Sequence, residues 1–506
     1  MVRSDSYFSS RDVILISALS ICAVLLSYFL IPIPPVDHEE MDSIVAALDS
    51  RDEPFYPILG YSVLAVLLEF SSEKGTILLF SMLLLFPMLL ISLSHLGRSL
   101  RIPRSLLIAA IVLLILNPIF IAYFLHTLSM AFPIFTLLNM LSLIFFFKFV
   151  SRLGNGRHMH FGLLFILTQI LASYTALFAF ASLFSMFLSG LFVLSLKGKL
   201  KSSIVRYSSV FMMILLPTVH LLQKLSDYGD TQGSEMIVTE TISSFFLSFS
   251  YLFPAVILLI YSFYRSYKED IPRIRSSRGS YSSVLFFSYT LILLSVFLLS
   301  SILLRFNAFR TMSFTLPIIY FSAICIPYCS APRRHKKALH GMMMIFVFLP
   351  GIVFSSSAIM DHMSYAGGFS EFRESVYSHI ASGNTSSVVF SPYTVFYQYK
   401  NQFGLGYEDM LTDDGALILR QYYTEGIPEP ELSTDKMEIA SHKIHLTPKV
   451  PESGNMALDT SIERPLLLVI DSRYPDYYDR DHISEACTEM ISYSHEALYL
   501  CEDDVA

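Results

Sequence analysis

The sequence predicts an all-α membrane protein of about eleven transmembrane helices, followed by a small α/β domain that faces water. Hydrophobic residues make up 53% of the 506 positions and charged residues only 15%, and the mean hydropathy is +0.55. Such a composition is too apolar for a soluble globular protein. Apolar runs of about 20 residues, the length that crosses a bilayer, recur through the first 360 positions.

Charge divides the chain into two parts. Residues 361–506 contain 25 acidic and 9 basic residues, a formal charge of -16, which leaves +9 for residues 1–360. We therefore predict a polytopic transmembrane domain over 1–360 and an acidic tail domain over 361–506.

The amino-terminal run has the basic start and apolar stretch of a signal peptide. No small-residue cleavage site precedes Pro32, and the run is long enough to span the bilayer, so we expect an uncleaved first helix. Loop Lys and Arg orient the remaining spans, because basic loops stay cytoplasmic. The spans are expected at about 12–33, 76–96, 105–118, 129–150, 161–173, 176–196, 204–222, 241–264, 281–304, 312–329 and 338–357.

This count leaves the amino terminus in the cytoplasm and the tail domain outside. It also places a first outer loop over residues 34–75, which packs four carboxylates into the seven residues 36–42. The apolar stretch 56–70 is only about 15 residues long and contains Glu69, so we expect an interfacial or re-entrant helix. A twelfth span there would invert every later loop against the charge rule.

The tail domain has the pattern of a small α/β module. Helices are expected at 369–380, around Phe396–Tyr399 and at 480–491. Strands are expected at 387–390, 465–471 and 497–501, and residues 424–454 are expected to form a loop. Cys487 and Cys501 allow two alternatives: a disulfide if the tail faces an oxidising compartment, or two thiols.

Several landmarks occur in a recognisable order. They are the acidic first loop, the element Tyr56-Pro57-Ile58-Leu59, Gly75 before the second span, Asn117-Pro118 after the third, and the late segment Arg310–Pro317. This order resembles the GT-C fold glycosyltransferases, such as protein O-mannosyltransferases and lipid A aminoarabinose transferases, over nearly the whole chain. In two places the chain departs from that family: His38 follows Asp37 where a Glu is usual, and Thr311 replaces a Tyr after Arg310.

The resemblance implies an integral membrane glycosyltransferase that moves a sugar from a polyprenyl-phosphate donor, such as a dolichyl phosphate sugar, to an acceptor outside. The acceptor is a glycan, a lipid or a protein. Membrane lipids are further expected partners, and nucleic acid is not. Asp37 matches the family's base, and Glu39 is the substitute. Another interpretation is that these carboxylates cap a short helix starting near Met41.

Further residues are candidates for binding. Arg310 and Arg305 are the only basic residues between the ninth and tenth spans, on the outer side, and suit the donor phosphate. Snorkelling to the interface is the alternative. Glu40, Tyr56 and His126 are candidate substrate or metal contacts. A divalent cation, Mg or Mn, is a possible cofactor, since some relatives need one, whereas a His126 bonded to backbone is the simpler interpretation.

Two other functions remain compatible with the sequence. One is a lipid-linked oligosaccharide flippase or transporter, although charged residues are nearly absent from the expected spans. The other is a catalytically inactive GT-C-like subunit for binding or assembly, which the missing Glu after Asp37 keeps open.

Overall fold

The computed structural model describes residues 10–30, 58–71, 74–100, 102–115, 120–153, 159–176, 178–226, 282–304, 349–381, 387–391, 437–439, 442–446, 465–471, 487–493 and 496–501, with the single positions 318, 321, 341, 345 and 483. The chain divides into two units. The first comprises Met1–Leu30, Pro54–Val63 and Leu78–Met360, and the second comprises Ile31–Glu53, Leu64–Ile77 and Asp361–Ala506.

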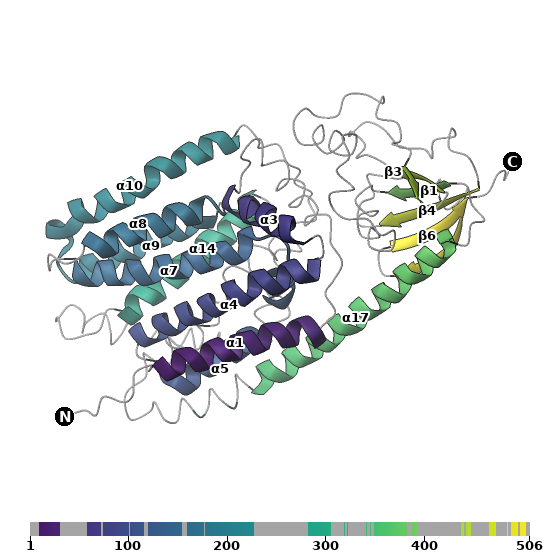
Figure 1. Ribbon diagram of the computed structural model, residues 1–506. Helices are drawn as coiled ribbons and strands as arrows, with labels where there is room; N and C mark the ends of the chain where they lie inside the picture. Colours follow the sequence, from purple (N-terminus) through teal and green to yellow (C-terminus); the bar gives the residue numbers. More distant parts are fainter. Residues whose placement is uncertain are drawn as a thin grey trace. The chain divides into compact units, whose positions relative to one another are not determined.

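The first unit is a helix bundle whose elements follow the apolar runs of the sequence (Figure 1). The helices that lie in it wholly or in part are α1 (Ser10–Leu30), α3 (Ile58–Phe70), α4 (Lys74–Ser99), α5 (Arg104–Ile115), the π-helical turn η1 (Ile121–Leu125), α7 (Ala131–Arg152), α8 (Met159–Ser173), α9 (Phe178–Leu196), α10 (Leu200–Ser226) and α14 (Ser282–Leu304). The expected helix over 56–70 is confirmed as α3. The turn η1 lies between the third and fourth expected spans.

Three described helices are long and apolar enough to cross a membrane: Lys74–Ser99, Ala131–Arg152 and Ala179–Leu196. They indicate an integral membrane protein, as the composition predicts. The expected span at 241–264 lies outside the described residues, as does the one at 312–329 except for Ile318 and Phe321. The number of eleven spans therefore stays a prediction.

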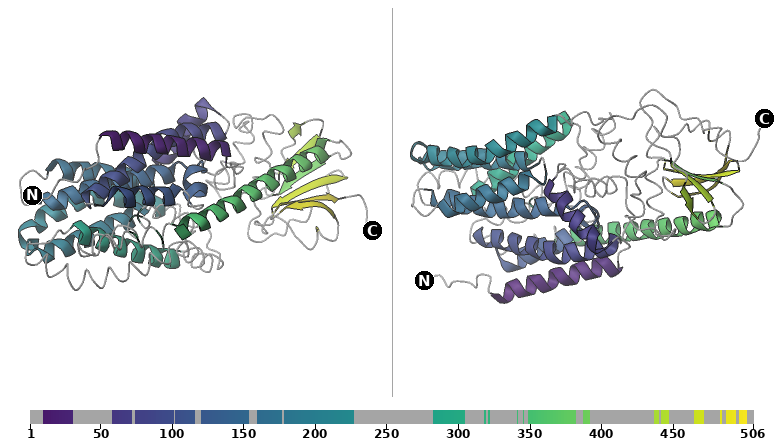
Figure 2. Two further views of the ribbon diagram at one scale, coloured as in Figure 1. Left: turned by 90° about the horizontal axis from the view of Figure 1, so that it is seen from below. Right: turned by 45° about the horizontal axis from the view of Figure 1, so that its top comes forward.

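Aromatic side chains fill the space where α8 packs against α7 and against α10. Figure 2 shows the bundle that contains these helices from two further sides. The ring centroids of Phe146 and Phe165 lie 5.4 Å apart, and Phe165 lies 5.4 Å from Phe211 on α10. Tyr207 packs 4.8 Å from Phe211. All four rings are buried, with only slight exposure of Phe211. Their packing joins the three helices through apolar contacts.

Gly190 on α9 provides the space for Tyr207. The Tyr207 hydroxyl donates to the carbonyl oxygens of Met186 and Phe187, 3.0 and 2.8 Å away, and a Cβ at Gly190 would overlap the ring. We expect Gly190→Ala to displace the ring and to cost about 1–3 kcal/mol of stability, the usual effect of overpacking. The measurement is thermal unfolding of the purified protein in detergent.

Gly162 on α8 offers the matched control. A Cβ there would meet Phe149 at 3.4 Å, which is an ordinary contact. Gly162→Ala gains helix propensity, so we expect unchanged or raised stability. Equal melting temperatures for the Gly190→Ala and Gly162→Ala variants would contradict the close packing of Tyr207.

The second unit contains a six-stranded mixed sheet with the order β2-β3-β1-β4-β6-β5. β1 runs parallel to both β3 and β4, and the remaining neighbours are antiparallel. The strands are β1 (Ser387–Ser391), β2 (Met437–Ile439), β3 (His442–Leu446), β4 (Leu466–Asp471), β5 (Thr488–Tyr493) and β6 (Glu496–Cys501). The strands expected at 387–390, 465–471 and 497–501 are thus confirmed.

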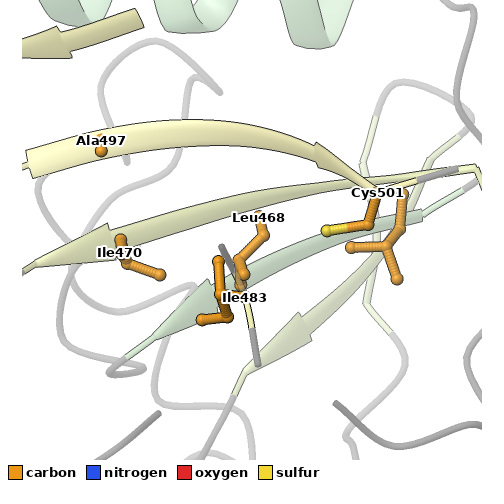
Figure 3. Packing of buried hydrophobic residues seen from close by; sticks show 6 residues of the cluster. Leu468, Ile470, Ile483, Ala497 and Cys501 are labelled. Atoms are coloured by element: carbon orange, nitrogen blue, oxygen red, sulfur yellow. The ribbon is translucent and has the colours of Figure 1, made fainter. Parts of the chain in front are cut away.

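An apolar cluster lies against β4 and β6 (Figure 3). It includes Leu468, Ile470, Ile483, Ala497 and Cys501. The sulfur of Cys501 is bonded to that of Cys487, which is partly buried against the same cluster. Of the two alternatives that the sequence left open, the structure contains the disulfide.

Three expectations for the tail were wrong. Residues 488–493 form strand β5 and not the end of a helix over 480–491, because they pair with β6 in a hairpin next to the disulfide. The expected loop 424–454 contains β2 and β3. The helices expected at 338–357 and 369–380 are not separate: α17 runs unbroken over Leu349–Ala381.

Candidate functional site

His126 is the one predicted site residue that lies within the described chain. Its backbone N–H donates to the carbonyl oxygen of Ile121 at 2.9 Å, the five-residue spacing of a π-helical turn. Phe120 and Phe124 stack at 4.5 Å between centroids and hold this turn against Phe86 of α4. The turn thereby directs His126 into the protein, where its exposure is only 3%.

The His126 ring is fixed by the first helix. Its Nε2 lies 2.9 Å from the hydroxyl oxygen of Ser27, and this hydrogen bond is buried. Ser27 stands one turn before Leu30, where α1 ends and the chain enters the acidic loop. His126 therefore bonds a side chain of α1, whereas the simpler interpretation from the sequence had it bonded to backbone.

The start of α3, which follows residues 31–57, packs close to the same part of the bundle. We call this part the His126 corner. The N–H of Leu59, in the first turn of α3, donates to the carbonyl oxygen of Tyr174 at 3.3 Å. First-turn N–H groups have no acceptor inside their own helix, so this bond supplies one. Gly60 touches the backbone of Ala131, the first residue of α7, where a Cβ would come within 2.8 Å.

Both flanks of residues 31–57 thus meet the segment 126–131. Ser27 on the incoming side contacts His126, and Gly60 on the outgoing side contacts Ala131, five residues further along the chain.

The other predicted site residues lie outside the described part of the chain. These residues are Asp37, Glu39, Glu40, Tyr56, Arg305 and Arg310. The first four belong to residues 31–57, of which the structure describes only the two flanks, α1 and α3. Their roles stay predictions.

A buried polar contact joins α7, α9 and α14, and the sequence analysis missed it. The Ser182 hydroxyl donates to Oδ1 of Asn139 at 2.5 Å and lies 3.0 Å from the hydroxyl of Tyr289. All three side chains are buried. Hydrogen bonds of this kind hold helices together in an apolar bundle.

A second contact of the same kind joins α7, α8 and α9. Ser142 donates to Oε1 of Gln169 at 2.6 Å, and Nε2 of Gln169 donates to the carbonyl oxygen of Ala179 at 2.9 Å. The sequence signal for these contacts is an Asn or Gln side chain within an apolar run. Helical periodicity does not predict which neighbouring helix supplies its hydrogen-bond partner. Within the described stretches, no three His, Cys, Asp or Glu side chains gather to hold a metal ion.

In the second unit, the parallel strands β1 and β4 both end at polar residues. β1 ends at Ser391 and β4 at Asp471, and Asp471 pairs in register with Glu496. The guanidinium of Arg373, on α17, lies 3.6 Å from the Glu496 carboxylate in a buried ion pair. Carboxyl ends of parallel strands are the usual position of ligand sites in α/β sheets.

Fold and site geometry together define an integral membrane protein with a helix bundle, a mixed-sheet unit and an acidic loop whose flanks meet one corner of the bundle. No protein-family model matches the chain, and a search of curated proteins finds no match.

Proposed function

We propose that the protein is an integral membrane glycosyltransferase that transfers a sugar from a polyprenyl-phosphate donor to an acceptor hydroxyl outside the cytoplasm. The observation that carries the proposal is the corner at His126, where the two flanks of the acidic loop meet. Such a tether would hold the loop's carboxylates at the bilayer edge, where charge is expensive without a functional partner.

The proposed reaction needs a base and positive charge. Asp37, or Glu39 in its place, takes the proton of the acceptor hydroxyl as its oxygen attacks the anomeric carbon. The bond from that carbon to the phosphate oxygen breaks, and polyprenyl phosphate leaves. Arg310 and Arg305 stabilise the charge on the departing phosphate.

We assign His126 a positioning role. Its Nε2 is engaged by Ser27, so the ring links α1 to the turn after α5 and is not free to serve as a ligand through that nitrogen. A divalent cation held by Asp37 and Glu39 would supply further positive charge to the leaving phosphate.

An assay of the purified protein tests the proposal directly. Polyprenyl-phosphate sugars are offered with and without acceptors, and release of polyprenyl phosphate is measured. We expect release, and faster release with the right acceptor. A folded protein that binds the donor without releasing phosphate would favour the inactive binding subunit, and movement of the intact donor across vesicle membranes would favour the flippase.

We further propose that the amino terminus faces the cytoplasm and residues 361–506 lie outside. The disulfide Cys487–Cys501 supports this orientation, because disulfides persist in oxidising compartments. The basic residues after α9, from Lys197 to Lys201, also support this orientation, because basic loops stay cytoplasmic.

Lys197 provides a test of sidedness. Burial, with Lys199 close by, lowers the pKa of Lys197 to about 8. Near pH 8 much of its amino group is therefore neutral and nucleophilic. We expect a membrane-impermeant acylating reagent to modify Lys197 in inside-out vesicles but not in intact cells, as read by peptide mass spectrometry.

Lys197→Arg is the matched control and should lose that labelled peptide. Labelling of Cys487 and Cys501 in intact cells, after an impermeant reductant, should show the opposite sidedness. Modification of Lys197 in intact cells would contradict the proposed orientation.

A further inference from the structure

Two cationic side chains converge on one aromatic ring where α7 ends and α8 begins. The Lys148 ammonium lies 5.4 Å from the centroid of the Phe161 ring, and the Arg152 guanidinium carbon lies 4.6 Å from it. The His160 ring is adjacent, with its centroid 4.0 Å from that of Phe161. Lys148 and Arg152 are one helical turn apart, a spacing at which like charges repel.

The described helices from α4 to α10 contain no carboxylate that could offset these charges. From Lys74 to Ser226 the sequence contains no Asp and no Glu, while α4, α5, α7 and α10 each have basic residues at one or both ends. Arg98 in the last turn of α4 and Arg152 in the last turn of α7 are further basic residues at helix ends. The basic end of α4 and α7 therefore gathers positive charge that an anion from outside these helices would neutralise.

An apolar stripe on α8 starts beside this cluster. Met159, Leu163, Leu167 and Leu171 follow one another at four-residue spacing, and their exposed fractions lie between 37% and 74%. Four-residue spacing places them on one face of the helix. In a membrane protein such a face suits an acyl chain, and its first residue lies next to His160 and Phe161 in the sequence.

We propose that Lys148, Arg152 and the Phe161 ring form a binding site for an anionic phospholipid, whose acyl chain lies along the exposed stripe of α8. Arg152 binds the headgroup phosphate through two N–H groups, Lys148 adds a point charge, and Phe161 holds both side chains in place. This lipid site uses residues other than those proposed for the donor phosphate. It therefore stands independently of the glycosyltransferase proposal.

The test measures lipid retention by the whole protein. The purified protein is exchanged into micelles containing equal amounts of phosphatidylglycerol and phosphatidylcholine, and bound lipids are counted by native mass spectrometry. We expect preferential retention of phosphatidylglycerol. Because each basic residue contributes about a fivefold increase in affinity for an anionic surface, the Lys148→Gln/Arg152→Gln variant should lose roughly tenfold or more of that preference.

Lys199→Gln/Lys201→Gln is the matched control. It removes two charges from exposed positions at the start of α10, and it should keep the preference. Phe161→Leu retains both charges and should weaken retention less than the double substitution. Unchanged elution on size exclusion verifies that each variant is folded. Equal retention of the two lipids by the original protein, or an equal loss in the two double variants, would overturn the lipid site.

Discussion

Asp37→Asn is expected to lower the rate of sugar transfer by a factor of about 10²–10⁴, the usual contribution of a general base. An amide of nearly the same shape fills the position but does not accept the proton of the acceptor hydroxyl. The measurement is release of polyprenyl phosphate by purified protein. Donor binding should survive, because Arg310 and Arg305 are proposed to hold the phosphate.

Variants of the neighbouring carboxylate Glu39 distinguish a catalytic base from a residue that only caps a helix. Glu39→Gln should reduce transfer less than Asp37→Asn if Asp37 is the base, and more if Glu39 takes that role. Loss of a helix cap costs only about 1 kcal/mol, so a capping role would appear as a small stability change with activity retained. Full activity in both single variants and in the double variant would refute the proposed chemistry.

The sequence predicted the bundle helices well because two physical signals coincide in them. An apolar run of bilayer length sets where a helix lies, and flanking basic residues set where it ends. For α7, expected at 129–150 and found at Ala131–Arg152, and for α9, expected at 176–196 and found at Phe178–Leu196, both ends agree within two residues.

The tail was harder to predict, because long-range contacts decide its elements. Residues 488–493 have apolar positions that suit a helix as well as a strand. They form a strand because they pair with β6. The apolar patterns at 338–357 and 369–380 were interpreted as two helices. In the structure Gly368 lies inside α17, where the absence of a side chain lets Tyr493 pack against the helix.

Of the predicted site residues, the structure describes only His126, and its contacts were not predictable from the sequence. His126 was identified from its position after the third span, yet its partner Ser27 is 99 residues away, and no periodicity predicts such a pair. The buried bond between Asn139 and Ser182 was missed for the same reason. Single sequences identify polar residues in apolar runs, but the packing of the helices selects their partners.

Arg373→Met is expected to destabilise the second unit by about 3–5 kcal/mol, the cost of removing one partner from a buried ion pair. Arg373 and Glu496 are 5% and 1% exposed, and their charged groups lie 3.6 Å apart. Met fills most of the volume of Arg, so the loss reports the uncompensated charge of Glu496 more than a cavity. Hydrogen exchange of β4 and β6 in the purified protein measures the effect.

Two further variants separate charge from packing. Glu374→Gln removes an exposed charge one residue away on α17, and surface changes of this kind usually stay within about 0.5 kcal/mol. Arg373→Met/Glu496→Leu removes both charges, and because the desolvation cost of the pair disappears, it should recover most of the stability lost in the single variant. If the double variant were as unstable as Arg373→Met alone, the contacts of the Arg373 stem would hold α17 to the sheet, and the ion pair would not.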